Sequence, residues 1–103
     1  MVYNVNLPKL LRHLKQSAKS RNLEFNLTEG DLMTLSFPIT CPILGVELEY
    51  GNRKYSPNKP SVDRIDSAEG YIKDNIQILS FAANRAKNNL TDKELKLFAI
   101  YYK

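Results

Sequence analysis

The strongest constraint on the fold is a change of periodicity within residues 60–88. Apolar and charged residues alternate around Val62 to Asp66, which is typical of a β-strand. Gly70 follows in a turn-like stretch, where glycine can adopt a positive φ at little cost. Residues 76–79 are rich in β-branched side chains and predict a second strand. The two strands are therefore expected to form a hairpin.

A helix is predicted directly after the second strand. Ser80 is a suitable N-cap for a helix over residues 81–87. The order is then strand, loop, strand and helix, and we call residues 60–88 the finger. Its first strand carries carboxylates, and its helix carries amides and cations.

The finger resembles the HNH, or ββα-metal, nucleases (His-Me finger nucleases), in particular phage endonucleases of the endonuclease VII-like type. The residues that carry the resemblance are Ser61, Asp63, Arg64, Ile65, Asp66, Gly70, Tyr71, Asn75, Asn84, Arg85 and Lys87. Their combined order and spacing is specific, whereas a single piece such as the run DRID is not. The resemblance implies a metal-dependent DNA endonuclease of phage or prophage type.

The resemblance also implies a metal site between the first strand and the helix. Asp63 and Asn84 match the positions of the two metal ligands. Carboxylate and amide oxygens suit Mg²⁺ or Mn²⁺. Asn75 matches the middle asparagine of the HNH motif, which fixes the loop through hydrogen bonds to its backbone, and Gly70 is expected to support the turn.

The general base is the point at which this chain departs from the resemblance. The family's histidine follows the metal-binding acid, but Arg64 stands there, and a protonated guanidinium is a poor base. Arg64 is then expected to orient the phosphate or to stabilise the transition state. Asp66 is the preferred base, with a turn-capping role as its alternative. Activation of water by the metal alone or by Tyr71 also stays open, and His13, the single histidine, is interpreted as a surface residue of the first helix.

Basic residues near the finger are candidate DNA contacts. Lys87 and Arg85 lie on its helix, and Arg53 and Lys54 lie in the polar loop before it. Asn88 is a second candidate on the helix. The first helix also carries an excess of cations, which is typical of a solvated face and compatible with phosphate binding.

Composition narrows the classes of partner and cofactor. The 103 residues have a net charge of +4, which is compatible with DNA as partner. The single cysteine, Cys41, excludes an internal disulfide and a cysteine-based zinc site, so no structural zinc is expected. No apolar run reaches the length of a membrane span. A cytoplasmic protein is expected, in the host cytoplasm if the gene is phage-borne.

The rest of the chain predicts mostly helix. Helices are expected over residues 8–22, from Thr28 to about Phe37, and from Asp92 to about Tyr102, the last one burying Leu95, Phe98, Ala99 and a tyrosine. Residues 46–50 alternate strictly and predict a further strand. The chain is therefore interpreted as one small α+β domain, residues 1–103, built around the finger.

Two other functions compete with the nuclease. A catalytically weak nucleic-acid-binding module on a degenerate finger would explain the loss of the histidine. An interaction protein such as an inhibitor would use the basic faces to meet an acidic partner. Retention of both Asp63 and Asn84 favours the nuclease, because a binding module needs neither ligand. A homodimer is left open.

Overall fold

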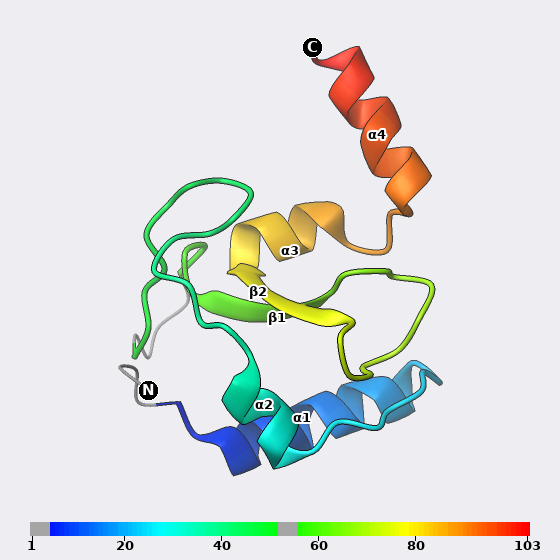
Figure 1. The fold of residues 1–103 in the computed structure, drawn as a ribbon. Helices are drawn as coiled ribbons and strands as arrows, with labels where there is room; N and C mark the ends of the chain where they lie inside the picture. The colour runs from blue at the N-terminus through cyan, green and yellow to red at the C-terminus, as the bar shows by residue number, and fades with distance from the viewer. Residues whose placement is uncertain (1–4, 52–55) are drawn as a thin grey trace.

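The computed structural model describes residues 5–51 and 56–103 (Figure 1). Within these ranges the elements are, in chain order, α1 (Leu7–Ser20), α2 (Glu29–Thr34), β1 (Pro60–Arg64), β2 (Ile76–Ser80), α3 (Phe81–Lys87) and α4 (Asp92–Tyr101). The prediction of a mostly helical α+β fold around a two-stranded antiparallel hairpin is confirmed.

The hairpin is shifted by two residues from its predicted start. Its register pairs Pro60 with Ser80 and Arg64 with Ile76. Beyond this point the carbonyl oxygens of Arg64 and Ile65 accept hydrogen bonds from the Lys87 ammonium. The first strand therefore ends at Arg64, where its backbone turns toward α3.

The hairpin lies between α3 and the N-terminal helices. Figure 1 shows α3 on one side of the strands and α1 with α2 on the other. One apolar cluster joins α1 to the hairpin and includes Leu14, Ala18, Leu32, Tyr71 and Ile76. A second cluster joins α3 to the segment before β1 and includes Cys41, Leu48, Ile78, Leu79 and Ala83. The two clusters bury apolar side chains on both sides of the hairpin, which fixes its position relative to α1, α2 and α3.

The loop between the strands is fastened to the segment that follows α1. Tyr71 N donates to Glu24 O at 2.9 Å, and Asn26 N donates to Tyr71 O at 3.2 Å. A Cβ at Gly70 would lie 2.1 Å from Glu24 O, so no side chain fits there. Gly70 is not among the described glycines with positive φ, and the predicted reason for this glycine is wrong. Close approach of two backbones, rather than φ, requires it.

Capping groups set the helix boundaries. The Asn6 side chain accepts from Lys9 N, and α1 ends at Ser20 rather than at the predicted Asn22, which has a φ of 54°. Asparagine tolerates that left-handed conformation better than most residues. The capping boxes of α2 and α4 hold the pKa of Asp31 and Glu94 below the usual value, through hydrogen bonds from Thr28 and Thr91.

Two predictions before the finger need correction: the end of the second helix, and the strand over residues 46–50. The second helix stops at Thr34 instead of Phe37, and Met33 next to its end is 68% exposed. Residues 46–50 form no strand; they contribute only a bridge between Thr40 and Glu47. Leu48 is nevertheless buried as its alternation predicts. The segment folds back on residues 39–41, which leaves room for one bridge and no ladder.

Cys41 lies in the core beside the start of α3. Burial raises the pKa of its thiol, but hydrogen bonds to the sulfur from the N–H groups of Leu44, Ser80 and Ile43 and from the Ser80 hydroxyl outweigh burial and bring the pKa to about 7. The contact between Ser80 N and Cys41 Sγ, 3.4 Å long, ties this loop to the finger. The cysteine thus joins two segments by packing and hydrogen bonding.

Helix α4 extends away from the hairpin (Figure 1). None of its residues is buried, and Phe98 and Tyr101 are 53% and 80% exposed. The prediction that this helix buries Leu95, Phe98 and Ala99 is therefore wrong. Its apolar residues meet mainly one another, as in the edge-to-face contact between Tyr101 and Tyr102.

No helix in the described ranges is long and apolar enough for a membrane crossing.

Candidate active site in the finger

Asp63 is the buried acid of β1. The register places it opposite Gln77, whose Nε2 donates to Asp63 Oδ2 at 2.9 Å. Lys87 Nζ lies 2.8 Å from the same oxygen. No described residue donates a hydrogen bond to Oδ1, and no unpartnered polar atom in the described part is fully buried. One carboxylate oxygen is thus held by protein while the other keeps access to solvent.

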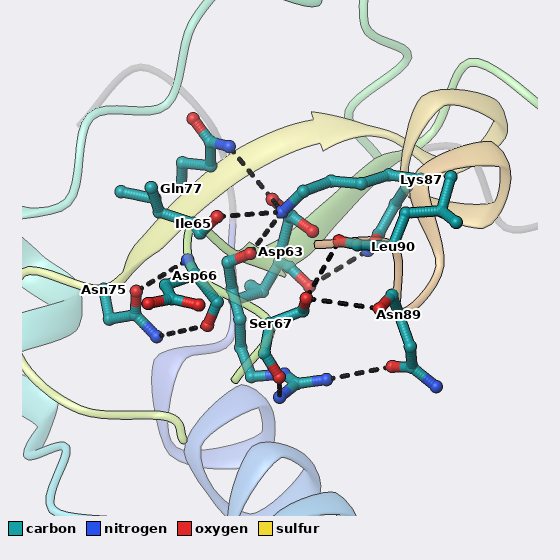
Figure 2. A network of polar contacts seen from close by, with 12 residues as sticks. Asp63, Ile65, Asp66, Ser67, Asn75, Gln77, Lys87, Asn89 and Leu90 are labelled. Carbon is teal, nitrogen blue, oxygen red and sulfur yellow. Dashed lines mark hydrogen bonds and ion pairs between the residues drawn. The ribbon is translucent and has the colours of Figure 1, made fainter. Parts of the chain in front are cut away.

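The Lys87 side chain connects α3 to the end of β1 (Figure 2). Its ammonium donates to Asp63 Oδ2, to the carbonyl of Arg64 and to the carbonyl of Ile65. An ammonium has three donors, so these acceptors use all of them. Lys87 is only 7% exposed. The prediction that it contacts a DNA phosphate is not supported by this arrangement, because phosphate binding requires at least one of these bonds to break.

Arg64 holds the loop of the finger. Its Nη1 donates to Ser67 O at 2.6 Å and to Glu69 O at 2.9 Å. Its Nη2 donates to Asn89 Oδ1 at 3.2 Å, in the turn that follows α3 (Figure 2). Arg64 therefore ties the loop after β1 to the turn after α3. Two of its five N–H donors have no hydrogen-bond partner among the described residues, so a contact with substrate is compatible with these bonds.

Asp66 and Asn75 organise the same loop. Asp66 Oδ1 accepts from Ala68 N at 2.9 Å, which is the turn cap weighed as the alternative to a base. Asn75 Oδ1 accepts from Asp66 N, while Nδ2 donates to Asp66 O and to Gly70 O. These contacts correspond to the loop-fixing role that the resemblance implies for Asn75. Asp66 is exposed and does not line the cavity beside Asp63.

Asn84 faces β1 from the helix. Its Nδ2 donates to Ser61 Oγ at 2.7 Å and to Val62 O at 3.0 Å. These two bonds orient the amide, and no described residue donates to its Oδ1. Asn84 lies on α3, and Ser80 sets the start of this helix as its N-cap. The Ser80 hydroxyl accepts a hydrogen bond from Ala83 N at 3.2 Å. The helix thus begins at the point where β2 ends.

Asp63 and Asn84 line one cavity of about 240 Å³ between β1, α3 and the end of α1. Three further lining residues are Arg21, Tyr71 and Arg85. Arg21 Nη2 donates to the Tyr71 hydroxyl, and its guanidinium lies 5.7 Å from the centre of that ring. The sequence pattern of the finger does not predict that Arg21 lines this cavity. Arg21 follows α1, and tertiary packing places it there.

The cavity is rich in positive charge. Arg21, Arg64 and Arg85 line it, against the single carboxylate of Asp63, which Lys87 already pairs. Such an excess attracts phosphate groups. Arg85 is exposed on the rim, with its guanidinium 5.8 Å from the centre of the Phe81 ring. Of the predicted DNA contacts, Arg85 is thus accessible, whereas Arg53 and Lys54 lie outside the described residues.

The donor set of the cavity fits a hard divalent cation. Asp63 and Asn84 each present an Oδ1 to which no described residue donates, and carboxylate and amide oxygens are the ligands that Mg²⁺ and Mn²⁺ prefer. In the described ranges no group of three acidic, histidine or cysteine side chains exists that would form an all-protein cage. Magnesium commonly keeps several waters and binds one or two protein oxygens together with phosphate. Two protein oxygens match that ligand count, and the assignment of Asp63 and Asn84 as metal ligands stays a prediction.

Comparisons with known proteins bear on the fold of this site. No protein-family model matches the chain, and no curated protein matches it. Among solved structures it is similar to the rare-cutting HNH restriction endonuclease PacI, with a TM-score of 0.65 and 22% sequence identity. The match covers 90% of this chain and 73% of the PacI chain. A sequence identity of 22% supports the fold only. It does not distinguish endonucleases of the endonuclease VII-like type from other HNH nucleases, so that assignment stays a prediction. The chain has the HNH endonuclease fold.

Proposed function

We propose that this protein is a metal-dependent DNA endonuclease that hydrolyses phosphodiester bonds at the finger. The observation that carries the proposal is a pair of oxygens without a hydrogen-bond donor among the described residues, Asp63 Oδ1 and Asn84 Oδ1, which line one cavity together with arginines. A module that only binds DNA needs the cations and has no use for this pair. The fold that it shares with a restriction endonuclease gives independent support. Phage or prophage origin and a cytoplasmic location remain part of the proposal.

In the proposed mechanism the cavity receives the scissile phosphate. Asp63 and Asn84 would hold Mg²⁺ or Mn²⁺ through their Oδ1 atoms. When bound, the cation polarises the phosphate and stabilises the leaving oxygen. Arg21 and Arg85 bind phosphate oxygens from the wall and the rim, where their charge also stabilises the transition state. Arg64 keeps the loop in place and meets developing charge with its two remaining N–H groups.

A base must take one proton from the attacking water as the new P–O bond forms and the old one breaks. Apart from Asp63 and the arginines, Tyr71 is the titratable side chain among the described residues that line the cavity. Asp66 caps its turn outside the cavity. Tyr71, in the phenolate form beside the Arg21 guanidinium, would accept that proton and is therefore the better-placed base candidate. Asp66 stays the alternative that mutation has to test.

The proposal is tested by incubating the protein with supercoiled plasmid. We expect nicking with Mg²⁺ or Mn²⁺ and none with EDTA, because the water and the phosphate both require the cation. Relaxed and linear products are separated by electrophoresis over a time course. Tight DNA binding without nicking under any divalent cation would contradict the enzyme proposal and favour a DNA-binding module. That module is the second candidate because Arg64, which stands in place of the family's histidine, is engaged in contacts with the loop.

A rim contact can be tested through the salt dependence of binding. Arg85→Ala should lower the affinity for all DNA sequences and reduce the slope of log affinity against log salt by about 0.9, the value for one lost phosphate contact. Arg85→Lys should keep most of the slope because the charge is retained. Lys93→Ala removes an exposed cation on α4 that does not line the cavity, and it should leave the slope unchanged. A slope unaltered by Arg85→Ala would show that this guanidinium does not reach a phosphate.

A further inference from the structure

A second hollow of about 390 Å³ shares a wall with the candidate active site. Five residues line both cavities, namely Ser61, Val62, Tyr71, Phe81 and Asn84. The second hollow runs along α1 and reaches His13 and Lys59. The two cavities are therefore adjacent, with Asn84 and Tyr71 at their common boundary, and we call the two together the groove.

The groove has a polar edge that comes from one face of α1. His13, Ser17 and Arg21 follow each other at intervals of four residues, so they lie on the same side of the helix. His13 and Ser17 line the second hollow, and Arg21 lines the first. At ~1.5 Å per residue the eight residues from His13 to Arg21 span roughly 12 Å along the helix. That length equals the axial rise of three to four nucleotides of one strand at ~3.4 Å each.

We infer that the second hollow is a further DNA subsite, in which His13 binds another phosphate of the strand held at Asp63 and Asn84. The inference rests on the proposed function for its choice of ligand. An imidazolium donates hydrogen bonds from both ring nitrogens, which suits a phosphate oxygen. Lys59 lines the same hollow, with its ammonium 5.0 Å from the centre of the Phe81 ring, and adds positive charge to this end. His13 thus extends the basic wall of the groove beyond Arg21.

The subsite predicts a dependence of DNA binding on pH. Histidine changes its charge between about pH 5 and pH 8, and binding to a phosphate favours the charged form. The other titratable side chains that line this hollow in the described part are Tyr50, Lys59 and Tyr71. In model peptides the charge of tyrosine and of lysine does not change between about pH 5 and pH 8. Wild-type affinity should therefore rise as pH falls from 8 to 6, through the gain of one phosphate contact.

The test measures affinity for a short DNA duplex in EDTA, so that no cleavage is needed. At pH 6, His13→Gln should reduce the slope of log affinity against log salt by about 0.9. At pH 8 the variant and the wild type should have equal slopes. His13→Lys, which carries a charge at both values, should restore the steeper slope at both. His13→Gln on an exposed helix position is not expected to disturb folding.

The outcomes separate this inference from the nuclease proposal. Equal slopes for wild type and His13→Gln at pH 6 would overturn the subsite, whether or not the plasmid is nicked. Loss of nicking in His13→Gln with binding unchanged would also overturn it, in favour of a role in proton transfer. A pH-dependent slope that requires His13, in a protein that never nicks plasmid, would support the subsite and leave the enzyme proposal as the one that fails.

Discussion

Asp63→Asn is expected to abolish plasmid nicking while the protein stays folded and binds DNA. Asparagine keeps an oxygen that can accept from Lys87 and Gln77, so the contacts that hold the finger can persist. It removes the negative charge that a divalent cation requires from this ligand. Metal catalysis supplies several kcal/mol of transition-state stabilisation, and each ~1.36 kcal/mol is a factor of ten in rate. A loss of roughly a thousandfold or more is therefore expected.

The matched control is Asp66→Asn, the same chemical change three residues further along. Asparagine can cap the turn at Ala68 as aspartate does, so the loop should keep its shape. Nicking at close to the wild-type rate is expected, because Asp66 lies outside the cavity. A folded Asp66→Asn protein that has lost its activity would instead make Asp66 the base. Near-wild-type nicking by Asp63→Asn would remove the central ligand from the proposed mechanism.

The order of the finger could be predicted from sequence because each of its signals is local. The alternation around Val62 to Asp66 predicts one strand, and the β-branched residues of 76–79 predict another. Ser80 predicts the start of a helix. These patterns depend on neighbours within a few residues, and the hairpin and α3 follow from them. The role of Asn75 was implied by the resemblance rather than by such a pattern, and its three side-chain bonds reach only the adjoining loop.

The partners of the cations could not be predicted in this way. Lys87 follows Asn84 by three residues, so the helical period places both on the side that faces β1. Sequence alone does not say whether a lysine on that face reaches outward to a phosphate or inward to a carbonyl. The choice depends on where β1 ends, because the acceptors are the carbonyls of its last residue, Arg64, and of Ile65, which follows it.

Residues from separate elements were missed for a related reason. Arg21 follows α1 as its C-cap and has no pattern that distinguishes it from the other cations of that helix. It reaches the cavity because the loop after β1 docks on the segment after α1, through the close contact of Gly70 with Glu24. The exposure of α4 is the opposite case. Its residues are apolar enough to be buried, yet no other described element packs against them.

Lys87→Met is expected to destabilise the protein by about 3–5 kcal/mol, the typical cost of removing one partner from a buried ion pair. Methionine fills a similar volume but leaves the Asp63 carboxylate with Gln77 as its remaining donor. It also leaves the carbonyls of Arg64 and Ile65 without the ammonium that they share. The free energy of unfolding is measured by urea titration with a probe of secondary structure.

Two companion variants identify the cause of that loss. Lys96→Met removes the lysine of an ion pair with Asp92 whose side chains are 74% and 86% exposed, and it should cost no more than about 0.5 kcal/mol. Adding Asp63→Asn to Lys87→Met should recover part of the stability, because a neutral amide costs less to bury than a carboxylate. A cost for Lys87→Met as small as that of Lys96→Met, together with a flatter salt dependence of DNA binding, would mean that the ammonium reaches solvent and phosphate. The larger cost with an unchanged slope is expected, because the three acceptors of Lys87 all belong to the finger itself.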